Sequence, residues 1–444
     1  MRAATILDRP WRAPEAVLSA FADDPWACAF LSGGTGERAR WSYVLRNPDE
    51  TLTVRPDAVG DPFAAMKAML GETRPSHPDG PPFQGGLAGL AAYELGDRIE
   101  PLDLARHPDW PDLSVGRYPN LLAFDHREHR VLAIGADHDG AEEAAGWLSA
   151  PERPANRAPL AALADPPTAA ELYEAAVADV IARIHDGEYF QANIARLWTG
   201  RLAEGATPFD LLARLAGQSA APFAGYLRLP GRAVVSNSPE RFVSVGAGRA
   251  LTVETRPIKG TRPRGHTPTE DARLAAELLA SDKDRAENLM IVDLMRNDLS
   301  RVCTPGAVTT PELFRVESFA NVHHLVSTVC GQLAPGLTAI DLLEAAFPPG
   351  SVTGAPKVQA MKSIARLEPP RGPYCGALLW AGFDGAFDSS VLIRTVGLVE
   401  GGGGWRYEAR AGAGIVADSD PRAERLETEA KIAALLRALT EPLA

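Results

Sequence analysis

Short apolar segments separated by clusters of turn residues run through most of this chain. The earlier ones include WACAFL, TLTVR and NLLAFD, and the later ones AGYLRL, AVVSNSPERFVSV, ALTVETRPIKG, ALLWAGF, SSVLIRTVGLV and WRYEARAGAGIV. Segments of this kind are typical of antiparallel strands joined by hairpins. The 40 glycines and 37 prolines among 444 residues exceed average usage and supply many turns. The pattern predicts large antiparallel sheets.

Two helical regions interrupt the strands. Thr168 and Glu171 have the spacing of a capping box, and apolar residues then recur on one helical face as far as Asp186-Gly187. The second region opens at residues 267–270, where capping-box spacing is combined with Pro268 at the first helical position. Because strands and helices occupy separate stretches, we expect an α+β fold in which large antiparallel β-sheets pack with helices.

The stretch from Asp137 to Pro167 is rich in Ala, Pro, Asp and Glu, a composition that separates structural segments without building strands. We place a boundary there. It divides the chain into an N-terminal β-rich subdomain, residues 1–150, and a C-terminal catalytic domain, residues 168–444.

Charge and cysteine usage exclude several classes of protein. Lys and Arg number 45 against 57 Asp and Glu, a net charge of −12, which disfavours a nucleic-acid-binding protein. The four cysteines are far apart and form neither a disulfide framework nor a CxxC zinc motif. The sequence has neither a secretory signal nor an apolar run of membrane-spanning length, so we expect no membrane association and a cytoplasmic location.

Two helical segments carry paired carboxylates. Asp284 and Glu287 lie three residues apart, as do Glu424 and Glu427, so each pair projects from one helical face. Taken alone, each pair is more simply a solvated surface, and Glu427 with Lys431 a surface ion pair. If the two helices met, the oxygen atoms would suit a hard ion such as Mg²⁺.

Lys259, in TRPIKGTRPR, is either an ordinary strand-end lysine or a nucleophile. A lysine of ordinary pKa costs about 4.6 kcal/mol to deprotonate at pH 7, so a nucleophilic role needs burial or neighbouring positive charge. Gly260 would let another group approach the backbone closely. Glu240, in SNSPERF, is a candidate proton donor across the hairpin, or else a partner of Arg241.

Three segments could bind carboxylates. GSVTGAPK at 350–357 lacks the residue order of a phosphate loop, but its backbone N–H groups could hold a carboxylate. The Gly412-Ala413-Gly414 turn offers a second group of donors. Arg394 could bind a carboxylate with two hydrogen bonds, although a strand arginine more often pairs with a protein acid. Together these donors suit a small polyanion.

In this order, the segments resemble the chorismate-utilising enzymes. The matching motifs are SPERF, TRPIKGT, DRAENLMIVDLMRND, VHHLVSTV, GSVTGAPK, IRT and GAGIVADSDP, and PFQGG and GEYFQANIA extend the match towards the N-terminus. The resemblance covers almost the whole chain, and it implies one complex chorismate-binding unit.

Two positions distinguish branches of this family. Lys259 stands in a PIKGT motif, as in aminodeoxychorismate synthases, where anthranilate synthases usually have alanine. Gln191 stands where isochorismate and salicylate synthases have a water-activating lysine, and an amide cannot act as a base. The resemblance therefore implies amination of chorismate at C4 to 4-amino-4-deoxychorismate, on the route to 4-aminobenzoate and folate. In that reaction Lys259 attacks C2, Glu240 is the general acid for the leaving C4 hydroxyl, and ammonia then displaces the lysine.

The same resemblance implies Mg²⁺ as cofactor. Its ligands would be Glu287 and Glu427, with Asp284 and Glu424 bound directly or through water. The implied substrate-binding residues are Gly260, His324, Ser351, Tyr374, Arg394, Gly412 and Gly414. His323, the neighbour of His324, could fill its role instead.

Ammonia is expected from a separate class I glutaminase subunit in a heterodimer, since no cysteine here has the Gly-x-Cys-x-Gly setting of that enzyme's nucleophile. The main alternative is an anthranilate synthase component I, and a distant one is a non-catalytic glutaminase-binding scaffold. The sequence leaves open whether the product feeds folate or a secondary metabolite, and whether tryptophan regulates the chain.

Overall fold

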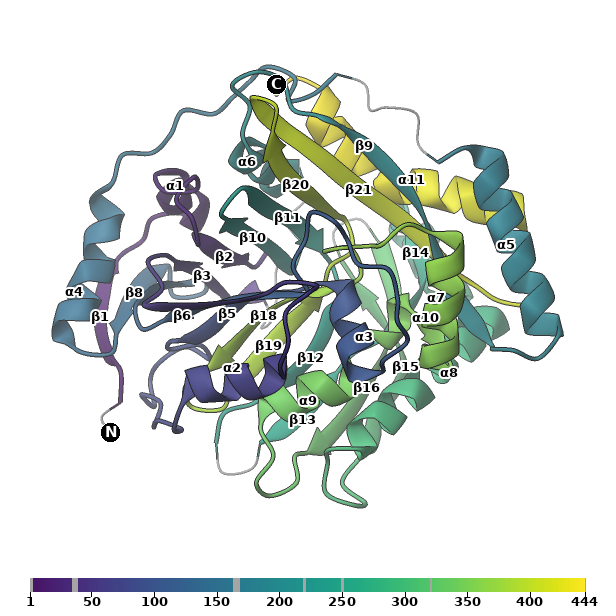
Figure 1. Cartoon of the computed structure of the whole chain (residues 1–444), viewed down its shortest axis with the longest axis horizontal. Helices are drawn as coiled ribbons and strands as arrows, with labels where there is room; N and C mark the ends of the chain where they lie inside the picture. Colours follow the sequence, from purple (N-terminus) through teal and green to yellow (C-terminus); the bar gives the residue numbers. More distant parts are fainter. Residues whose placement is uncertain are drawn as a thin grey trace.

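The computed structural model describes residues 3–33, 39–162, 168–218, 221–248, 251–319 and 322–443. Within them, two large sheets form the centre of the molecule, and every strand pair in both is antiparallel. Helices cover their outer faces (Figure 1). The α+β fold with large antiparallel sheets is confirmed.

The first sheet has eleven strands among the described residues. In spatial order they are β1 (Thr5–Pro10), β8 (Arg130–Gly135), β7 (Leu121–Asp125), β3 (Trp41–Leu45), β2 (Cys28–Leu31), β10 (Phe223–Leu229), β11 (Arg232–Ser238), β20 (Thr395–Gly401), β21 (Gly404–Ile415), β9 (Gln191–Arg201) and β17 (Gly354–Ala355).

The second sheet has ten strands among the described residues. In spatial order they are β14 (Ile258–Pro263), β16 (Val322–Gln332), β13 (Thr252–Thr255), β12 (Arg241–Val245), β19 (Phe387–Val391), β18 (Ala377–Gly382), β5 (Gly86–Ala91), β6 (Leu113–Tyr118) and β4 (Glu50–Val54), and β15 (Thr309–Ser318) pairs with β16.

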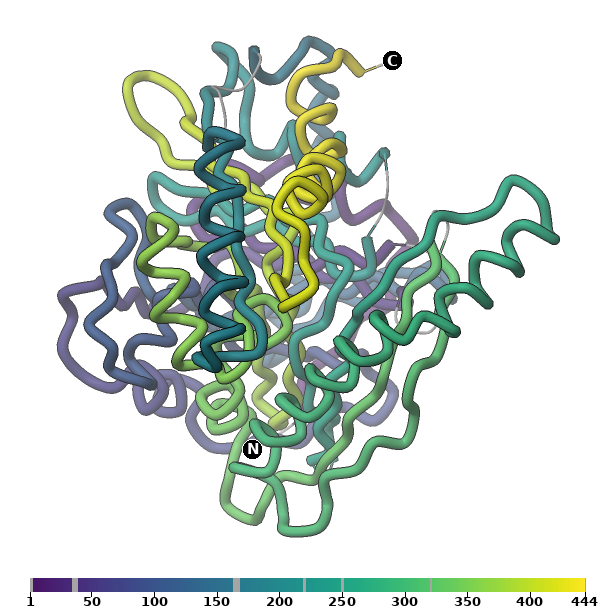
Figure 2. The backbone as a smooth tube through the Cα atoms, turned by 90° about the vertical axis from the view of Figure 1, so that its right-hand side faces the viewer, coloured from purple at the N-terminus to yellow at the C-terminus, as the bar shows by residue number. Residues whose placement is uncertain are grey.

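The α-helices are α1 (Pro14–Ser19), α2 (Pro62–Leu70), α3 (Gly96–Ile99), α4 (His138–Gly146), α5 (Ala170–His185), α6 (Pro208–Gln218), α7 (Pro268–Ala280), α8 (Asp282–Ser300), α9 (Ala339–Ala346), α10 (Lys357–Leu367) and α11 (Pro421–Thr440). Short 3₁₀ turns occur at Tyr93–Leu95, Trp147–Ser149 and Gly350–Val352. Helices α5 and α11 lie side by side (Figures 1 and 2), joined by an ion pair of 2.7 Å between Glu174 and Arg425.

The two sheets pack face to face. Apolar side chains from both enter one buried cluster, among them Tyr43 and Leu227 from the first sheet and Leu90 and Trp380 from the second. The approach is close: a methyl group at Gly225 would lie 2.3 Å from Leu378 of the other sheet. Strands from before residue 150 and from after residue 168 occur in both sheets, so the expected subdomains share their sheets.

The sequence predicted two segments as continuous strands, but in the structure each is divided between the two sheets. The first runs from β11 to β12, and the second from β19 to β20. Pro239 explains the first break, because its missing N–H cannot continue a ladder. At the second break Arg394 has a φ of +50°, a left-handed conformation that ends a strand. Glu240 and Arg394 therefore lie at neighbouring crossovers between the sheets.

Of the two predicted helix caps, the one at Thr267 is confirmed and the one at Thr168 is wrong. Thr267 accepts a hydrogen bond from the Glu270 N–H at 3.2 Å and caps α7, as expected. Helix α5 forms where expected, but its N-cap is Ala169, which has no side-chain cap. The Thr168 hydroxyl instead accepts a hydrogen bond from the Leu197 N–H of β9, a tertiary contact that outweighs the local capping preference.

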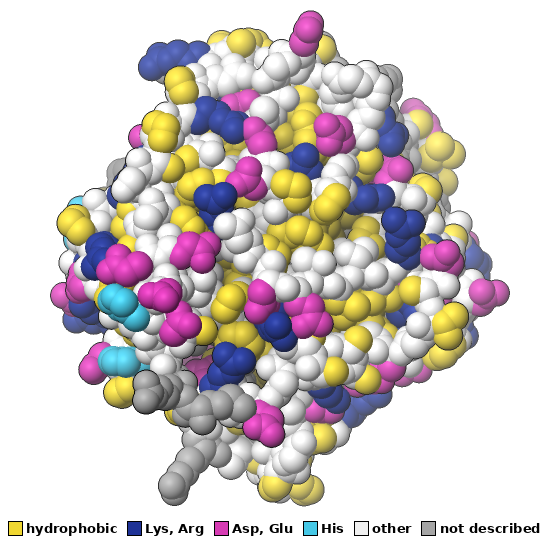
Figure 3. Space-filling view, turned by 60° about the vertical axis from the view of Figure 1, so that its left-hand side comes forward, with side chains coloured by type: hydrophobic (Ala, Val, Ile, Leu, Met, Phe, Trp, Pro, Cys, Tyr) yellow, Lys and Arg dark blue, Asp and Glu magenta, His cyan; other side chains and the backbone are white. Residues whose placement is uncertain are grey.

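The four cysteines are all free thiols, as their spacing predicted. No helix in the described part of the chain is long and apolar enough to cross a bilayer. On the face drawn in Figure 3, basic and acidic side chains are interspersed.

Candidate active site

Lys259 lies where the edge strand β14 of the second sheet meets β21 of the first. Its backbone pairs with Leu325 on β16, and the register shifts before Thr261, at Gly260. A methyl group at Gly414 of β21 would lie 3.1 Å from Lys259 Nζ and 3.0 Å from Gln191 Nε2. A larger residue at Gly414 would push both side chains aside by a few tenths of an ångström, so Gly414 shapes the space around the amine.

The Lys259 amine has no hydrogen-bond or ion-pair partner among the residues that the structure describes. Burial is the main cause that lowers its pKa, and the positive charge of Lys431 acts in the same direction. The carboxylates of Glu287, Glu240 and Glu427 oppose this shift. The net depression favours the neutral amine, the form that a nucleophile needs.

Glu240 is buried at the first crossover, with 7% of its surface exposed. Burial raises its pKa to about 7, against a hydrogen bond from Ser351 and the charges of Lys259 and Lys431, which lower it. Ser351 Oγ donates to Glu240 Oε1 at 2.8 Å. Arg241, the alternative partner, pairs instead with Asp388 and Glu254, both at 2.9 Å. Glu240 is thus a carboxyl poised to hold or release a proton near neutral pH.

Helices α8 and α11 bring both carboxylate pairs to the same side of the site. The pKa of Glu287 is raised by burial first, and the nearby charges of Asp284 and Glu427 add to the shift. The pKa of Glu424 is likewise raised by burial, and again Glu427 adds to it. The sequence could not show whether charges on these two helices interact, and in the fold they do.

Each carboxylate now has a polar partner. Lys431 lies 2.7 Å from Glu427, Lys283 lies 3.9 Å from Glu287, and Arg262 lies 3.1 Å from Asp284. Ser419 donates to Glu424 at 2.7 Å. Across the described ranges, no three His, Cys, Asp or Glu side chains converge into a ready metal site. Hard oxygen donors that are partly buried and repel one another still fit a divalent cation, if the lysines are displaced.

The two adjacent histidines have different surroundings. His323 contacts Ser318 at 2.8 Å and Asp271 at 2.9 Å, which tie it to the start of α7. His324 contacts the Thr261 hydroxyl at 2.9 Å and the Gly260 backbone. Burial, together with the charge of Arg394, lowers the His324 pKa to about 4, so its ring is neutral at pH 7. His324 is therefore the histidine on the Lys259 side.

Arg394 has no carboxylate partner among the described residues, which contradicts the simpler expectation of a protein ion pair. Desolvation lowers its pKa, although part of the side chain reaches solvent. An unpaired guanidinium of this kind is available for an anionic ligand.

Tyr374 lies deeper than expected. Its ring is buried beneath Arg371, whose Cζ lies 5.7 Å from the ring centroid. The next residue, Cys375, donates its N–H to the Leu392 carbonyl at 2.9 Å, so the Tyr374 loop runs beside the Arg394 crossover. The described contacts connect Tyr374 with Arg371 and Cys375 rather than with Arg394.

Sequence reasoning gave Lys431 no role beyond a surface pair with Glu427. Its Nζ also donates to the Gly412 carbonyl at 2.9 Å, which connects α11 to β21. The expected turn at residues 412–414 is wrong, because these residues continue β21 and pair with β9. A methyl group at Gly412 would lie 2.8 Å from Asn193 Oδ1 on β9. The i+4 spacing from Glu427 predicted the ion pair but carried no signal for the contact with Gly412.

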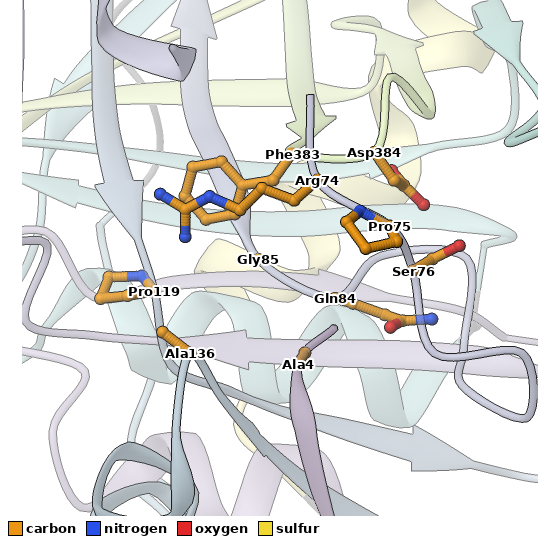
Figure 4. A pocket seen from close by; sticks show the side chains of 10 residues that line it. All are labelled: Ala4, Arg74, Pro75, Ser76, Gln84, Gly85, Pro119, Ala136, Phe383 and Asp384. Carbon is orange, nitrogen blue, oxygen red and sulfur yellow. The ribbon is translucent and has the colours of Figure 1, made fainter. Parts of the chain in front are cut away.

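A surface pocket elsewhere contains none of these residues. Arg74, Gln84, Phe383 and Asp384 are among those that line it (Figure 4), and Arg74 Cζ stacks 4.2 Å from the Phe383 ring centroid.

Comparison with known proteins shows the family and the fold. The profile of a family described as chorismate binding enzyme matches residues 27–437. The chain belongs to the chorismate binding enzyme family. An aminodeoxychorismate synthase component 1 from Salmonella typhimurium is 40% identical over 98% of each chain. An anthranilate synthase component 1 from Streptomyces coelicolor is also 40% identical, over 92% of this chain and 82% of its own.

The crystal structure of anthranilate synthase component I from Streptococcus pneumoniae has a TM-score of 0.79 and 28% identity, covering 91% of this chain and 93% of its own. Family and fold are therefore as the motif order predicted. The nearly equal identities to two kinds of chorismate binding enzyme leave the choice of reaction to the site.

Proposed function

We propose that this chain is the chorismate-aminating component of an aminodeoxychorismate synthase, with Lys259 as covalent nucleophile and Glu240 as general acid. The proposal depends mainly on the environment of the Lys259 amine. This amine has no hydrogen-bond or ion-pair partner among the described residues, its pKa is lowered, and it interacts electrostatically with Glu240, a carboxyl whose pKa is about 7. A chemically silent lysine would be expected in an ion pair or in solvent.

In the first step, the neutral amine of Lys259 adds to C2 of the chorismate ring. The ring double bonds shift, the C4–O bond breaks, and the proton of Glu240 goes to the departing hydroxyl, which leaves as water. Lys259 must be neutral and Glu240 protonated, and burial shifts both pKa values in those directions.

In the second step, ammonia adds to C4, the double bonds shift back, and the C2–N bond to Lys259 breaks, so that the lysine leaves as the neutral amine. The proton lost by the incoming nitrogen returns to the Glu240 carboxylate. The product is 4-amino-4-deoxychorismate, and Lys259 is regenerated. Gln191 supports ammonia as the nucleophile over water, because its neutral amide cannot take a proton from water. Its Oε1 and Nε2 atoms are buried and have no hydrogen-bond partner among the residues that the structure describes.

Arg394 is proposed to bind the enolpyruvyl carboxylate, helped by the backbone around Gly412 and Gly414, with His324 and Ser351 beside the ring. Gly260, at a φ of +79°, lets the Asp284 side chain approach the end of β14. Glu287 and Glu427 would hold Mg²⁺, with Asp284 and Glu424 in support. When bound, the ion supplies a positive charge for the ring carboxylate in a chain whose net charge is −12.

Similar proteins are named component 1, which supports a second component that supplies the ammonia. A class I glutaminase in a heterodimer is proposed for that role.

The direct test is product identification. The purified chain is incubated with chorismate, Mg²⁺ and an ammonium salt, and the expected product is aminodeoxychorismate without release of pyruvate. Anthranilate with pyruvate would instead establish the alternative favoured by the Streptomyces relative, an anthranilate synthase. Binding without turnover would indicate a scaffold.

A Lys259→Ala variant separates the two chemistries. Under the proposal it loses activity, and no covalent adduct of chorismate is found by mass spectrometry. Full activity in this variant would refute the covalent route.

A further inference from the structure

Arg371 lies behind the site in the loop between α10 and β18, with a side chain only 1% exposed. It donates to the Asn193 carbonyl at 2.7 Å and to the Val352 carbonyl at 3.1 Å. Its remaining donors form a fork onto Glu368, at 3.0 and 2.9 Å. Nothing in the proposed reaction uses this guanidinium directly.

The two carbonyl contacts join elements that carry the site. Asn193 belongs to β9 and pairs with Gly414, the residue beside the Lys259 amine. Val352 follows Ser351, whose hydroxyl donates to Glu240. The guanidinium therefore joins the turn at 350–352 to β9, in addition to the backbone pairing of β17 with β9 and the bond from the Asn193 N–H to the Thr353 carbonyl at 2.9 Å.

Glu368 holds the guanidinium in this orientation. It accepts a hydrogen bond from the Ala195 N–H of β9 at 2.7 Å, so both members of the ion pair are bonded to the same strand. On the other side, Glu94 accepts the backbone N–H groups of Arg371 and Gly372 at 2.5 and 3.0 Å. A buried ion pair adds little net stability compared with apolar packing, so this connected geometry is better explained by orientation than by stability.

We propose that Arg371 is a positioning residue that holds the Ser351 turn against β9 and so keeps the Ser351 hydroxyl on Glu240. The inference rests on the proposed function, because the acid role of Glu240 is what this positioning serves.

Glu240 faces three groups that stabilise its ionised form: the Ser351 hydroxyl, Lys259 from β14 and Lys431 from α11. Burial opposes all three. If Arg371 no longer holds the turn, the bond from Ser351 weakens while the lysines keep their places. The carboxyl then keeps its proton to a higher pH.

The test compares pH profiles of kcat/KM for chorismate consumption in four proteins: wild type, Ser351→Ala, Arg371→Lys and the double variant. Loss of one hydrogen bond should move the alkaline limb of Ser351→Ala upward by about 0.5 to 1 pH unit. Arg371→Lys should move it in the same direction. The double variant should show the Ser351→Ala shift and no more, because the bond that Arg371 preserves is already absent.

Arg410 is the matched control. It is buried in the same network, 3.7 Å from Glu368, but donates to the carbonyls of Pro369 and Pro370 rather than to the Ser351 turn. In Arg410→Lys, the alkaline limb of the kcat/KM profile should lie at the same pH as in the wild-type protein. If Arg371→Lys does not fold, Glu368→Gln loosens the same fork and should give the same shift.

The inference is overturned if Arg371→Lys, or Glu368→Gln in its place, lowers the rate equally at every pH. It is also overturned if the shifts add in the double variant. Failure of the proposed function would appear separately, as a different product of the wild-type protein.

Discussion

Ser351 Oγ donates a 2.8 Å hydrogen bond to Glu240 Oε1 across the junction of the two sheets. Ser351 lies in the 3₁₀ turn before β17, whereas Glu240 lies at the crossover from β11 to β12. The bond opposes the burial that raises the carboxyl pKa, and the balance leaves the pKa at about 7. A general acid works best with a pKa near the working pH, so under the proposed function this contact adjusts Glu240 for proton transfer.

Activity should therefore fall as the pH rises through about 7, because Glu240 must be protonated to act as an acid. Glu240→Gln should lower kcat by about 10² to 10⁴-fold and remove this alkaline limb. Glu254→Gln is the control, since Glu254 lies on the neighbouring strand β13 and pairs with Arg241. The measurement is a pH profile of kcat/KM for the wild type, Glu240→Gln and Glu254→Gln. An unchanged alkaline limb in Glu240→Gln would contradict the assignment of Glu240 as the general acid.

Gly414→Ala should impair catalysis while the fold persists. The added methyl group would lie 3.1 Å from Lys259 Nζ and 3.0 Å from Gln191 Nε2, and both side chains would have to move. We expect a loss of at least about 10²-fold in kcat/KM, as for a misplaced reacting group. Gly401→Ala, at the end of the adjacent strand with nothing within 4 Å, should behave as wild type. Chorismate turnover measures the loss of activity, and circular dichroism checks the fold of both variants. Equal activity of Gly414→Ala and Gly401→Ala would show that Lys259 and Gln191 can move aside without loss of function.

The sequence predicted where the strands lie but not which sheet each strand joins. Apolar alternation located the hairpin strands, and Gly401 pairs with Gly404 at the expected hairpin. Alternation does not tell which sheet a strand joins. The segments around Pro239 and Arg394 therefore read as single strands, although each passes from one sheet to the other. The Thr168 cap failed for a related reason, because its hydroxyl bonds to distant Leu197.

The candidate site also combines features that the sequence predicted with features that only the fold shows. Motif order predicted Lys259, Glu240 and the four carboxylates as site residues, and the fold brings Lys259 close enough to Glu240, Glu287 and Glu427 for their charges to interact. The sequence did not predict the carbonyl contacts of Lys431 with Gly412, or those of Arg371 with Asn193 and Val352. A carbonyl acceptor exists at every residue, so no side-chain pattern in the sequence marks such a partner.

Mg²⁺ affinity should depend on both helices. Glu287→Gln and Glu427→Gln should each weaken Mg²⁺ binding by about 10-fold or more, because each removes a charged oxygen ligand. Asp293→Asn is the control on α8, since Asp293 pairs with Arg296 on the exposed face of that helix. Calorimetric titration with MgCl₂ measures binding without turnover. Wild-type affinity in Glu287→Gln would refute the ligand assignment.

Glu240 should also lower the stability of the protein above neutral pH. Its pKa is raised from 4.5 in the unfolded chain to about 7 in the fold, so between these values the folded state holds a proton that the unfolded state releases. Stability from this group is therefore complete below pH 4.5, falls as the pH rises through 7, and stays low above it. The full penalty is on the order of 3 kcal/mol.

Glu240→Gln removes the charge and keeps an oxygen that can accept the Ser351 hydrogen bond. It should raise the thermal midpoint at pH 8 and leave it nearly unchanged at pH 4.5, so that an inactive variant is the more stable protein. Glu254→Gln, which only loses a partly exposed pair with Arg241, should gain no stability at pH 8. Thermal unfolding of the three proteins at both pH values is the measurement. A gain of equal size at both pH values would mean that better packing, rather than removal of a buried charge, stabilises the variant.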